Sequence, residues 1–341
     1  MLTPTSEEPA HPVSGSSDVS AGYFVTSEGS AHSVFGSSDV VRVGRRALVG
    51  AGLAVALAGC GRRAAVERLT IAAGETGGFY LEFAQLLAIQ LRVAGVAREV
   101  VVRETGGSTD NLRLLASRET DLALSLADAI PSGSDLRALG RVYENYLQCV
   151  VRADSPYKSL TDLAGTTISA GAAGSGAAVT AARLMTAAGV QCTQNHLPLG
   201  KAATALADKQ LDAMFWSGGV PTTTLDKLSR QVPIRLLPLG AWLAPLRRTY
   251  GSVYQDVLVP AGVYGAPSAV AVLGIPNLLL CRPDLPTAVA REITNTLARQ
   301  ARLLVPPSAV GAQYLNLQSL VVTNPIPLHP GAAAEYRHLY G

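Results

Sequence analysis

Short apolar runs and longer helical periods alternate along the chain. Residues 69–73 are apolar and short, as in a buried strand, whereas residues 79–93 carry apolar side chains every three or four positions, as in a helix. The same order returns with strands at 99–103, 122–126, 147–151, 166–170, 211–216, 235–239, 270–274 and 278–281, and with helices after Ser108 and at 177–188, 202–209, 222–230 and 288–304. Repeated units of this kind predict an α/β fold of mainly parallel sheets covered by helices.

Four loops between a predicted strand and a predicted helix are rich in glycine. They span residues 74–78, 105–108, 171–176 and 217–221. A strand that ends in such a loop presents backbone N–H groups and the positive end of a helix dipole. Ligands of parallel sheets bind beyond the carboxyl ends of the strands, where all four loops fall. We therefore expect the loops to line one cleft that holds a small anionic molecule without a metal or an organic cofactor.

Glycine in these loops has a second explanation, because tight turns require it whatever binds there. All four loops also carry a hydroxyl side chain, and their equivalent positions favour a binding site. None is a nucleotide motif. Residues 74–78 lack the dinucleotide spacing, and residues 171–176 are not followed by Lys-Ser or Lys-Thr.

Residues 41–60 have the order of an export signal. Basic residues precede the apolar stretch 47–58, which is too short to span a bilayer. The stretch ends in Leu-Ala-Gly before Cys60, which resembles a bacterial lipobox. We expect 41–60 to be a lipoprotein signal peptide, with Cys60 lipidated and the chain anchored to the outer face of the cell membrane. The alternative is a short buried helix beside an incidental cysteine, and the Arg45-Arg46 pair leaves twin-arginine export open.

Residues 1–40 show neither a helical nor a strand period. They are rich in Ser, Gly and Thr, which predicts disorder. Because the basic stretch begins directly after them, the alternative is that translation starts near Val41 and that 1–40 are a mis-annotated extension. N-terminal sequencing of the unprocessed precursor distinguishes these two interpretations.

Composition and motifs exclude several function classes. The formal net charge of +3 gives no case for nucleic acid. Cys149, Cys192 and Cys281 are widely spaced and predict buried small side chains rather than a metal site. No Gly-x-Ser-x-Gly, His-Glu-x-x-His or Cys-x-x-Cys motif is present, so we expect no enzyme. No carboxylate-rich loop predicts a bound cation.

Several segments together resemble a known family. They are 76–80 (Thr-Gly-Gly-Phe-Tyr), 105–112, 121–124 with Asp128 after them, 171–176, 212–222, 234–239, 259–264 and 327–331. In order and spacing the chain resembles, over roughly residues 66–341, the TAXI-type solute-binding proteins of tripartite ATP-independent periplasmic (TRAP) transporters. The resemblance implies a two-lobed, type II periplasmic-binding-protein fold, with a mainly parallel sheet covered by helices in each lobe and the ligand cleft between the lobes.

The chain order assigns residues 66–150 plus 258–341 to lobe 1 and residues 151–257 to lobe 2. We expect the lobes to close by bending near 150–153 and 256–262, where the chain crosses between them.

The resemblance also implies a function. The loaded protein would deliver a small carboxylate or amino acid, of the glutamate, glutamine or 2-oxoglutarate type, to the membrane subunits of a TRAP permease. A lipoprotein that senses the same solute and signals to a membrane histidine kinase would have the same pocket. A permease gene or a kinase gene beside this one discriminates between the two.

The family's ligand contacts, carried over by position, fall on all four loops. They are Thr76, Gly78, Phe79, Tyr80, Ser108, Asn111, Gly174, Ser175, Gly176, Ser217, Gly218, Gly219 and Val220. Two departures from the family pattern touch the pocket. Relatives often have an aromatic and then Pro-Leu-Gly after the tyrosine, where this chain has residues 81–83, and often have Gln at the position of Leu126.

Some of these residues have more than one interpretation. Tyr80 covers the edge of the core or, as we favour, directs its hydroxyl to a ligand carboxylate. Trp216 is as well explained by strand packing as by a cleft wall, and Asn111 by capping its own helix. We expect Ser108 and Ser175 to hydrogen-bond the anionic groups of the ligand.

Charged residues near the loops give weaker indications. Arg141 is a candidate partner for a ligand carboxylate, whereas surface solvation better explains Arg247 and Arg248. Glu82 is a candidate for selecting an amino group, which would favour an amino acid over an oxo acid.

Overall fold

The computed structural model describes residues 66–306 and 315–341. The chain divides into two units, Met1–Gly59 and Cys60–Gly341, and every described residue belongs to the second. The predictions for residues 1–40, for the signal segment 41–60 and for lipidation of Cys60 lie outside the described residues. Among the described residues, no helix combines the length and apolar character that a membrane-spanning segment needs.

Strands and helices alternate as the pattern predicts. Helix α2, Phe79–Val93, has the predicted bounds and buries one stripe of side chains that includes Phe83, Leu87 and Leu91. The strands are β1 Val66–Ala72, β2 Ala97–Arg103, β3 Leu122–Leu126, β4 Arg137–Arg152, β5 Thr167–Ser169, β6 Thr193–Asn195, β7 Ala213–Gly218, β8 Ile234–Leu236, β9 Gln255–Val259 and β10 Val270–Cys281. The other α-helices are α3 Ser108–Ala116, α4 Gly176–Ala188, α5 Leu199–Ala207, α6 Thr223–Gln231, α7 Leu243–Tyr250, α8 Thr287–Arg299, α9 Leu317–Leu320 and α10 Pro330–Tyr340.

The strands form one continuous sheet in the order β2-β1-β3-β10-β4-β7-β5-β6, with β8 beside β4 and β9 beside β10. At one end β1 pairs in parallel with β2 and β3, and at the other β5 pairs in parallel with β6 and β7. The two parallel groups are joined by the antiparallel pair of β4 and β10. Strands β3 and β7 are buried along their whole length, which explains why their sequences are apolar apart from Ser125 and Ser217.

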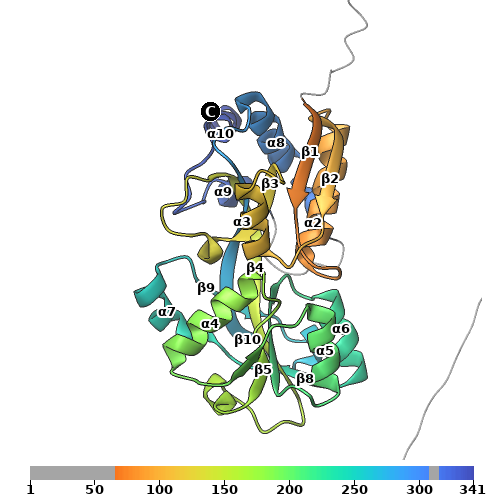
Figure 1. Ribbon diagram of the computed structural model, residues 1–341, viewed down its shortest axis with the longest axis vertical. Coiled ribbons are helices and arrows are strands. Elements are labelled where there is room, and N and C mark those ends of the chain that lie inside the picture. The colour runs from red at the N-terminus through yellow and green to blue at the C-terminus, as the bar shows by residue number, and fades with distance from the viewer. Residues whose placement is uncertain (1–65, 307–314) are drawn as a thin grey trace, which may run out of the picture. The chain divides into compact units, whose positions relative to one another are not determined.

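The sheet extends through two lobes, and of the described strands only β4 and β10 run through both (Figure 1). In one lobe, helices α2 and α8 pack with β1 and β3 around Phe83, Leu87 and Ile293. In the other, α4 packs on β4 and β7 around Leu184 and Phe215. Each lobe therefore has a hydrophobic core of its own.

Strand pairing shows where the chain passes from one lobe to the other. Strand β10 pairs with β9 over residues 270–274 and with β3 over residues 277–281, so it passes between the lobes near Pro276. Strand β4 begins to pair with β7 at Tyr146. The division at 150/151 and 257/258, with bending at 150–153 and 256–262, stays a prediction. The pairing favours bending points near Tyr146 in β4, before the predicted 150–153, and near Pro276 in β10, after the predicted 256–262.

The two long strands differ from the prediction. The predicted strand 147–151 is the end of the longer strand β4, and the predicted strands 270–274 and 278–281 are parts of the single strand β10. The polar residues in the middle of β4, Glu144, Asn145 and Gln148, are all buried within the sheet. Strand β10 accommodates the join through register shifts between Asn277 and Leu278 and between Leu279 and Leu280.

Helix ends also correct the prediction in places. The sequence predicts a helix after Ser108, with Ser108 as its N-cap. Ser108 is instead the first residue of α3, because Gly107, at φ 119°, occupies the cap position and no side chain caps the helix. The helix predicted over 288–304 ends at Arg299 and is followed by a 3₁₀ turn, Ala301–Leu304. Helix α7 and strand β6 were not predicted, since neither carries a clear apolar period.

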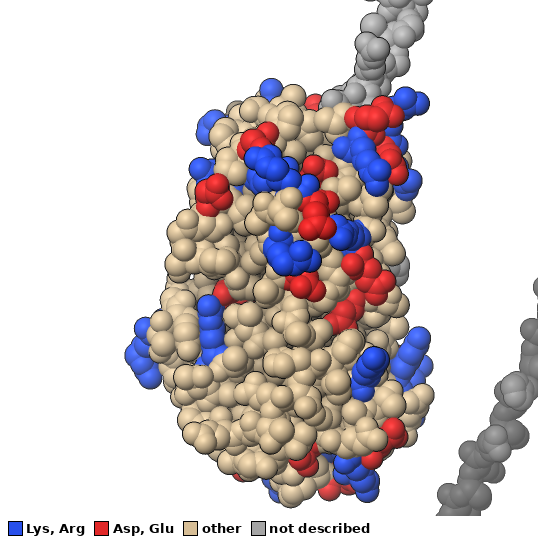
Figure 2. All heavy atoms as spheres, viewed as in Figure 1, with Lys and Arg blue, Asp and Glu red and all other residues tan. Residues whose placement is uncertain are grey.

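Charged side chains of both signs are intermixed over the lobe of β1 and β2 on the face shown in Figure 2. Several form ion pairs, such as Arg68 with Glu99 at 3.6 Å and Arg103 with Glu119 at 3.1 Å. All four of these side chains are well exposed, so each pair contributes little to stability.

The cysteine prediction holds for two of three residues. Cys149 and Cys281 are buried, whereas Cys192 is only partly buried on the short segment before β6. None of the three is in a disulfide.

Candidate functional site

A cavity of about 40 Å³ lies where the four glycine-rich loops meet. Eight of the residues predicted to contact a ligand line it: Gly78, Phe79, Tyr80, Ser108, Ser175, Gly176, Ser217 and Gly218. Five do not: Thr76, Asn111, Gly174, Gly219 and Val220. The loops therefore come together as the sequence predicts. In this closed arrangement the cavity has room for only about two or three water molecules.

Tyr80, in the first turn of α2, is buried and faces other side chains of its own lobe. Its hydroxyl donates to Asn277 Oδ1 and lies 3.2 Å from Ser108 Oγ. Burial raises the pKa of Tyr80 well above its usual range, so the hydroxyl stays protonated. Its ring makes an edge contact with Tyr143, as does that of Phe79 at a centroid distance of 4.9 Å. Tyr80 therefore both borders the cavity and covers the core, so the two interpretations of the sequence are not exclusive.

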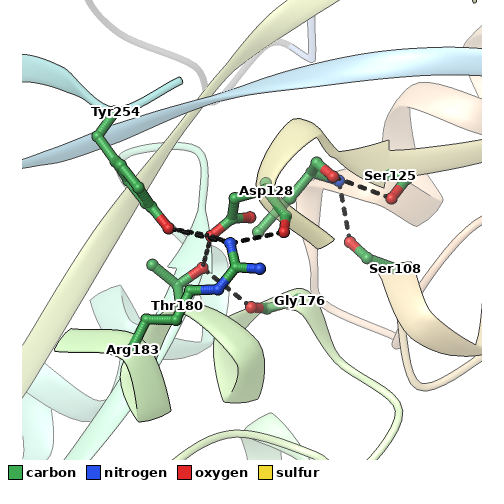
Figure 3. Close-up of polar contacts among 8 residues, drawn as sticks. Ser108, Ser125, Asp128, Gly176, Thr180, Arg183 and Tyr254 are labelled. Carbon is green, nitrogen blue, oxygen red and sulfur yellow. Dashed lines mark hydrogen bonds and ion pairs between the residues drawn. The ribbon is translucent and has the colours of Figure 1, made fainter. Parts of the chain in front are cut away.

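Ser108 lies at the point where α3 meets the end of β3. Its Oγ accepts the Leu126 N–H at 3.0 Å, and Figure 3 shows this contact beside the first turn of α4. Asn111, one turn later, donates to Ala73 O at 2.5 Å and Leu124 O at 2.8 Å. It thus ties β1 to β3 and does not cap its own helix.

Ser175 is the N-cap of α4. Its Oγ accepts the Ala178 N–H at 3.1 Å and donates to Ala172 O at 2.7 Å. The Ser175 hydroxyl therefore donates its proton within its own loop. This loop contributes to the cavity wall mainly through the first turn of α4, with Gly176 and Ala177.

The fourth loop follows β7. Trp216 donates its indole N–H to Thr222 Oγ1 at 2.9 Å, and its ring lines the cavity, so it is a cleft wall held in place by the loop. Ser217 Oγ has no hydrogen-bond partner among the described residues. Val220, at the cis peptide bond before Pro221, is buried away from the cavity.

Residues 71–338 match the sequence model of the NMT1-like family. The chain belongs to the NMT1-like family. This match spans both lobes and all four loops, so the cavity is built entirely from NMT1-like sequence. The narrower resemblance to TAXI proteins is taken up under the proposed function.

Three solved structures of other proteins are similar to this chain. A protein from Bordetella bronchiseptica RB50 is 15% identical, with 82% of this chain and 100% of that chain covered and a TM-score of 0.50. The periplasmic aliphatic sulphonate binding protein SsuA from Escherichia coli is 17% identical, with 80% and 83% covered and a TM-score of 0.43. An arginine transport system periplasmic binding protein from Legionella pneumophila is 15% identical, with 68% and 92% covered and a TM-score of 0.45.

The fold of this NMT1-like chain is the mixed α/β fold of type II periplasmic binding proteins, as predicted. It is a fold of binding proteins, in agreement with the prediction that the chain is not an enzyme.

The two lobes touch directly around the cavity of this NMT1-like protein. Gly174 O accepts the N–H groups of Thr109 and Asp110, at 3.0 and 3.2 Å, from the first turn of α3. On another side, Glu75 Oε2 accepts the Leu199 N–H at the start of α5, at 2.7 Å. These contacts hold the cleft closed, and they use helix N-termini that could otherwise face a ligand.

A buried polar cluster adds a third contact between the lobes (Figure 3). Asp128, just after β3, accepts the hydroxyl of Thr180 at 2.8 Å and that of Tyr254 at 3.1 Å. Arg183 donates to Asp128 O at 2.8 Å and lies 3.8 Å from its carboxylate. Burial raises the pKa of Asp128, and these partners oppose the rise. The cluster fixes α4, whose first turn lines the cavity, against the end of β3.

Sequence reasoning missed two polar residues of the cavity. Glu75 lies in the first loop but was passed over as a loop residue, and burial raises the pKa of its carboxyl. Asn145 lies in the middle of β4, where no motif marks it. The only signal for Asn145 was an amide within an apolar strand, since buried polar groups in strands need a reason.

The other charged candidates lie away from the cavity. Glu82 and Arg141 are not among its lining residues, and Arg141 instead pairs with Glu144 on the same strand. Arg247 donates to Tyr254 O at 2.8 Å, and Arg248 is exposed. Among the described residues that line the cavity, none is Lys, Arg or His.

We expect Tyr80→Phe to lower the free energy of unfolding by about 1–3 kcal/mol, because it leaves the buried Asn277 Oδ1 without its donor. Asn277 Nδ2 already has no partner among the described residues, so its amide would lose its one side-chain contact. Urea unfolding measures the change. Tyr250→Phe is the matched control, since that hydroxyl makes no hydrogen bond in the described chain, and should change stability by less than about 0.5 kcal/mol. Equal effects of the two variants would contradict the assignment.

Proposed function

We propose that this chain is an extracytoplasmic solute-binding protein that captures a small solute between its lobes and delivers it to a membrane permease. The observation that carries this proposal is the cavity itself. Both lobes contribute to it, and its wall comes from loops at the ends of β1, β2, β5 and β7. Binding at this edge, between two lobes, is the usual arrangement for small ligands of such sheets.

The solute we propose is a small carboxylate or amino acid. The first turns of α2 and α4 border the cavity, and N–H groups of a first helical turn have no partner within their own helix. With the helix dipole they attract a carboxylate without a cationic side chain. The same reasoning supports a direct ligand role for Ser108, the first residue of α3, and for the lining glycines Gly78 and Gly176 at the starts of α2 and α4, but gives Ser175 the role of holding α4.

The permease we propose is of the TRAP type, with the chain as its TAXI-type binding subunit. The support is the order of the segments 76–80, 105–112, 171–176 and 212–222, which form the site. We further propose that Cys60 carries a lipid that anchors the protein to the outer face of the cell membrane. Mass spectrometry of the mature N-terminus tests the anchor, and an unmodified Cys60 would refute it.

Thermal unfolding of the purified protein against amino acids, dicarboxylates and 2-oxo acids tests the function. A ligand that binds only the native state raises the unfolding temperature, by an amount set by its concentration relative to its dissociation constant. We expect one chemical class to raise it by several degrees. If well-folded protein responds to no member of the panel, the proposed solute class is wrong.

A further inference from the structure

The charge of the cavity wall is not what a purely anionic solute requires. Its one ionisable carboxylate is Glu75, and no cationic side chain lines it among the described residues. A dicarboxylate or an oxo acid would place an oxygen atom near the Glu75 carboxylate. Both groups are hydrogen-bond acceptors, so they would repel each other. A solute that carries a positive group as well as a carboxylate would avoid this repulsion.

Asn145 gives independent evidence for a donor on the solute. Its side chain is 1% exposed, and Nδ2 donates to Ser217 O at 3.3 Å. Because Ser217 O is an acceptor, this contact fixes which end of the amide is the oxygen. Asn145 Oδ1 has no partner among the described residues, although the residue lines the cavity. A buried acceptor without a donor is costly, so a donor on the ligand is the natural partner.

The aromatic walls suit the same group. Trp216 and Phe79 line the cavity, and the Trp216 indole N–H is already used by Thr222. Trp216 therefore offers the cavity no free donor, only carbon atoms of its ring, and indole rings attract ammonium groups. An acceptor on the ligand would gain nothing there.

We infer that the solute is a zwitterionic amino acid, which enters when the lobes part enough to widen the 40 Å³ cavity, with its ammonium group held by Glu75 and Asn145 and its carboxylate at the first turns of α2 and α4. This inference rests on the proposed function and narrows its solute class. Glu75 is then a specificity-determining residue. It has a second role as well, because its carboxylate also accepts the Leu199 N–H from the other lobe.

The experiment measures dissociation constants by calorimetry for matched pairs, glutamate against 2-oxoglutarate and alanine against pyruvate, in which only the ammonium is replaced by a keto oxygen. Wild-type protein should bind the amino acid of one pair at least about tenfold more tightly than its partner. Glu75→Gln should weaken that amino acid by about ten- to hundredfold, the range expected for one charge-assisted hydrogen bond, and leave the oxo acid unchanged or stronger. The glutamine carbonyl can still accept the Leu199 N–H, so the variant should fold.

Glu82→Gln is the matched control, since Glu82 lies on α2 outside the cavity wall, and it should change neither constant. Asn145→Ala should also reduce the preference for the amino acid. Equal binding of an amino acid and its oxo partner, or an unchanged preference in Glu75→Gln, would overturn this inference and leave the proposed function standing. If no compound of either type binds the folded wild-type protein, both are overturned.

Discussion

Replacing Gly174 with alanine should weaken solute binding by about ten- to hundredfold. A Cβ at this position would lie 2.3 Å from Cγ and Oδ2 of Asp110, on the other lobe. The contact exists only when the lobes are closed, and an extra methyl group in a packed site costs about 1–3 kcal/mol. The variant should therefore favour the open arrangement. Small-angle scattering should show a larger radius of gyration, and calorimetry with the solute found for wild-type protein should show the weaker binding.

Two further variants make this result specific. Gly200→Ala adds the same methyl group on α5, where no atom lies within 4 Å of the new Cβ, so binding and radius should match wild type. Asp110→Ala added to Gly174→Ala removes the obstructing carboxylate and should restore most of the affinity. If Gly174→Ala binds like wild type, the closed contact between the 171–176 loop and α3 is not part of the bound state.

Asp128→Ala should lower the free energy of unfolding by about 3–5 kcal/mol, the usual loss when one partner of a buried ion pair is removed. The substitution takes the acceptor from Thr180 and Tyr254 and the countercharge from Arg183; the Asp128 side chain is fully buried, whereas that of Arg183 is 29% exposed. Asp128→Asn keeps an acceptor for both hydroxyls and nearly the same shape. We expect it to lose clearly less than alanine does. Denaturant unfolding measures both changes.

Asp135→Ala is the control for this series, because Asp135 is exposed and its carboxylate makes no hydrogen bond in the described chain. It should alter stability by less than about 0.5 kcal/mol. A loss of less than 1 kcal/mol in Asp128→Ala would show that the cluster does not stabilise the native state. An equal loss in the asparagine variant would instead assign the effect to the charge of Asp128.

Most helices and strands, and their arrangement around the cavity, could be predicted from short stretches of sequence. The bounds of α2 follow from apolar spacing alone, and the meeting of the four loops follows from their positions at strand ends. What such stretches could not supply is the direction of individual polar side chains. Ser175 and Asn111 are suitable ligand residues by type, yet both are used by nearby backbone groups. A hydroxyl or an amide in a loop has the same sequence signature in either role, since only the folded backbone decides which acceptor is nearest.

Glu75 and Asn145 were missed because nothing in the nearby sequence marks their side chains as part of a binding site. Glu75 lies in a glycine-rich loop that was interpreted through its backbone, and Asn145, outside every motif, faces the cavity only because β4 continues unbroken through both lobes. That continuity depends on pairing between β4 and β10, which are distant in sequence. Patterns within a short window contain no information about such pairing.

The uninterrupted passage of β4 and β10 through both lobes limits how the molecule can move. If two flexible loops connected the lobes, each lobe could rotate as a rigid body. Two hydrogen-bonded strands instead twist and bend along their whole length and resist that rotation. Deformation should concentrate at the register shifts in β10, next to Asn277, where the ladder is already irregular. Asn277 accepts the Tyr80 hydroxyl, which borders the cavity. The part of β10 that should resist opening is therefore hydrogen-bonded directly to Tyr80, a residue of the cavity wall that a solute would touch.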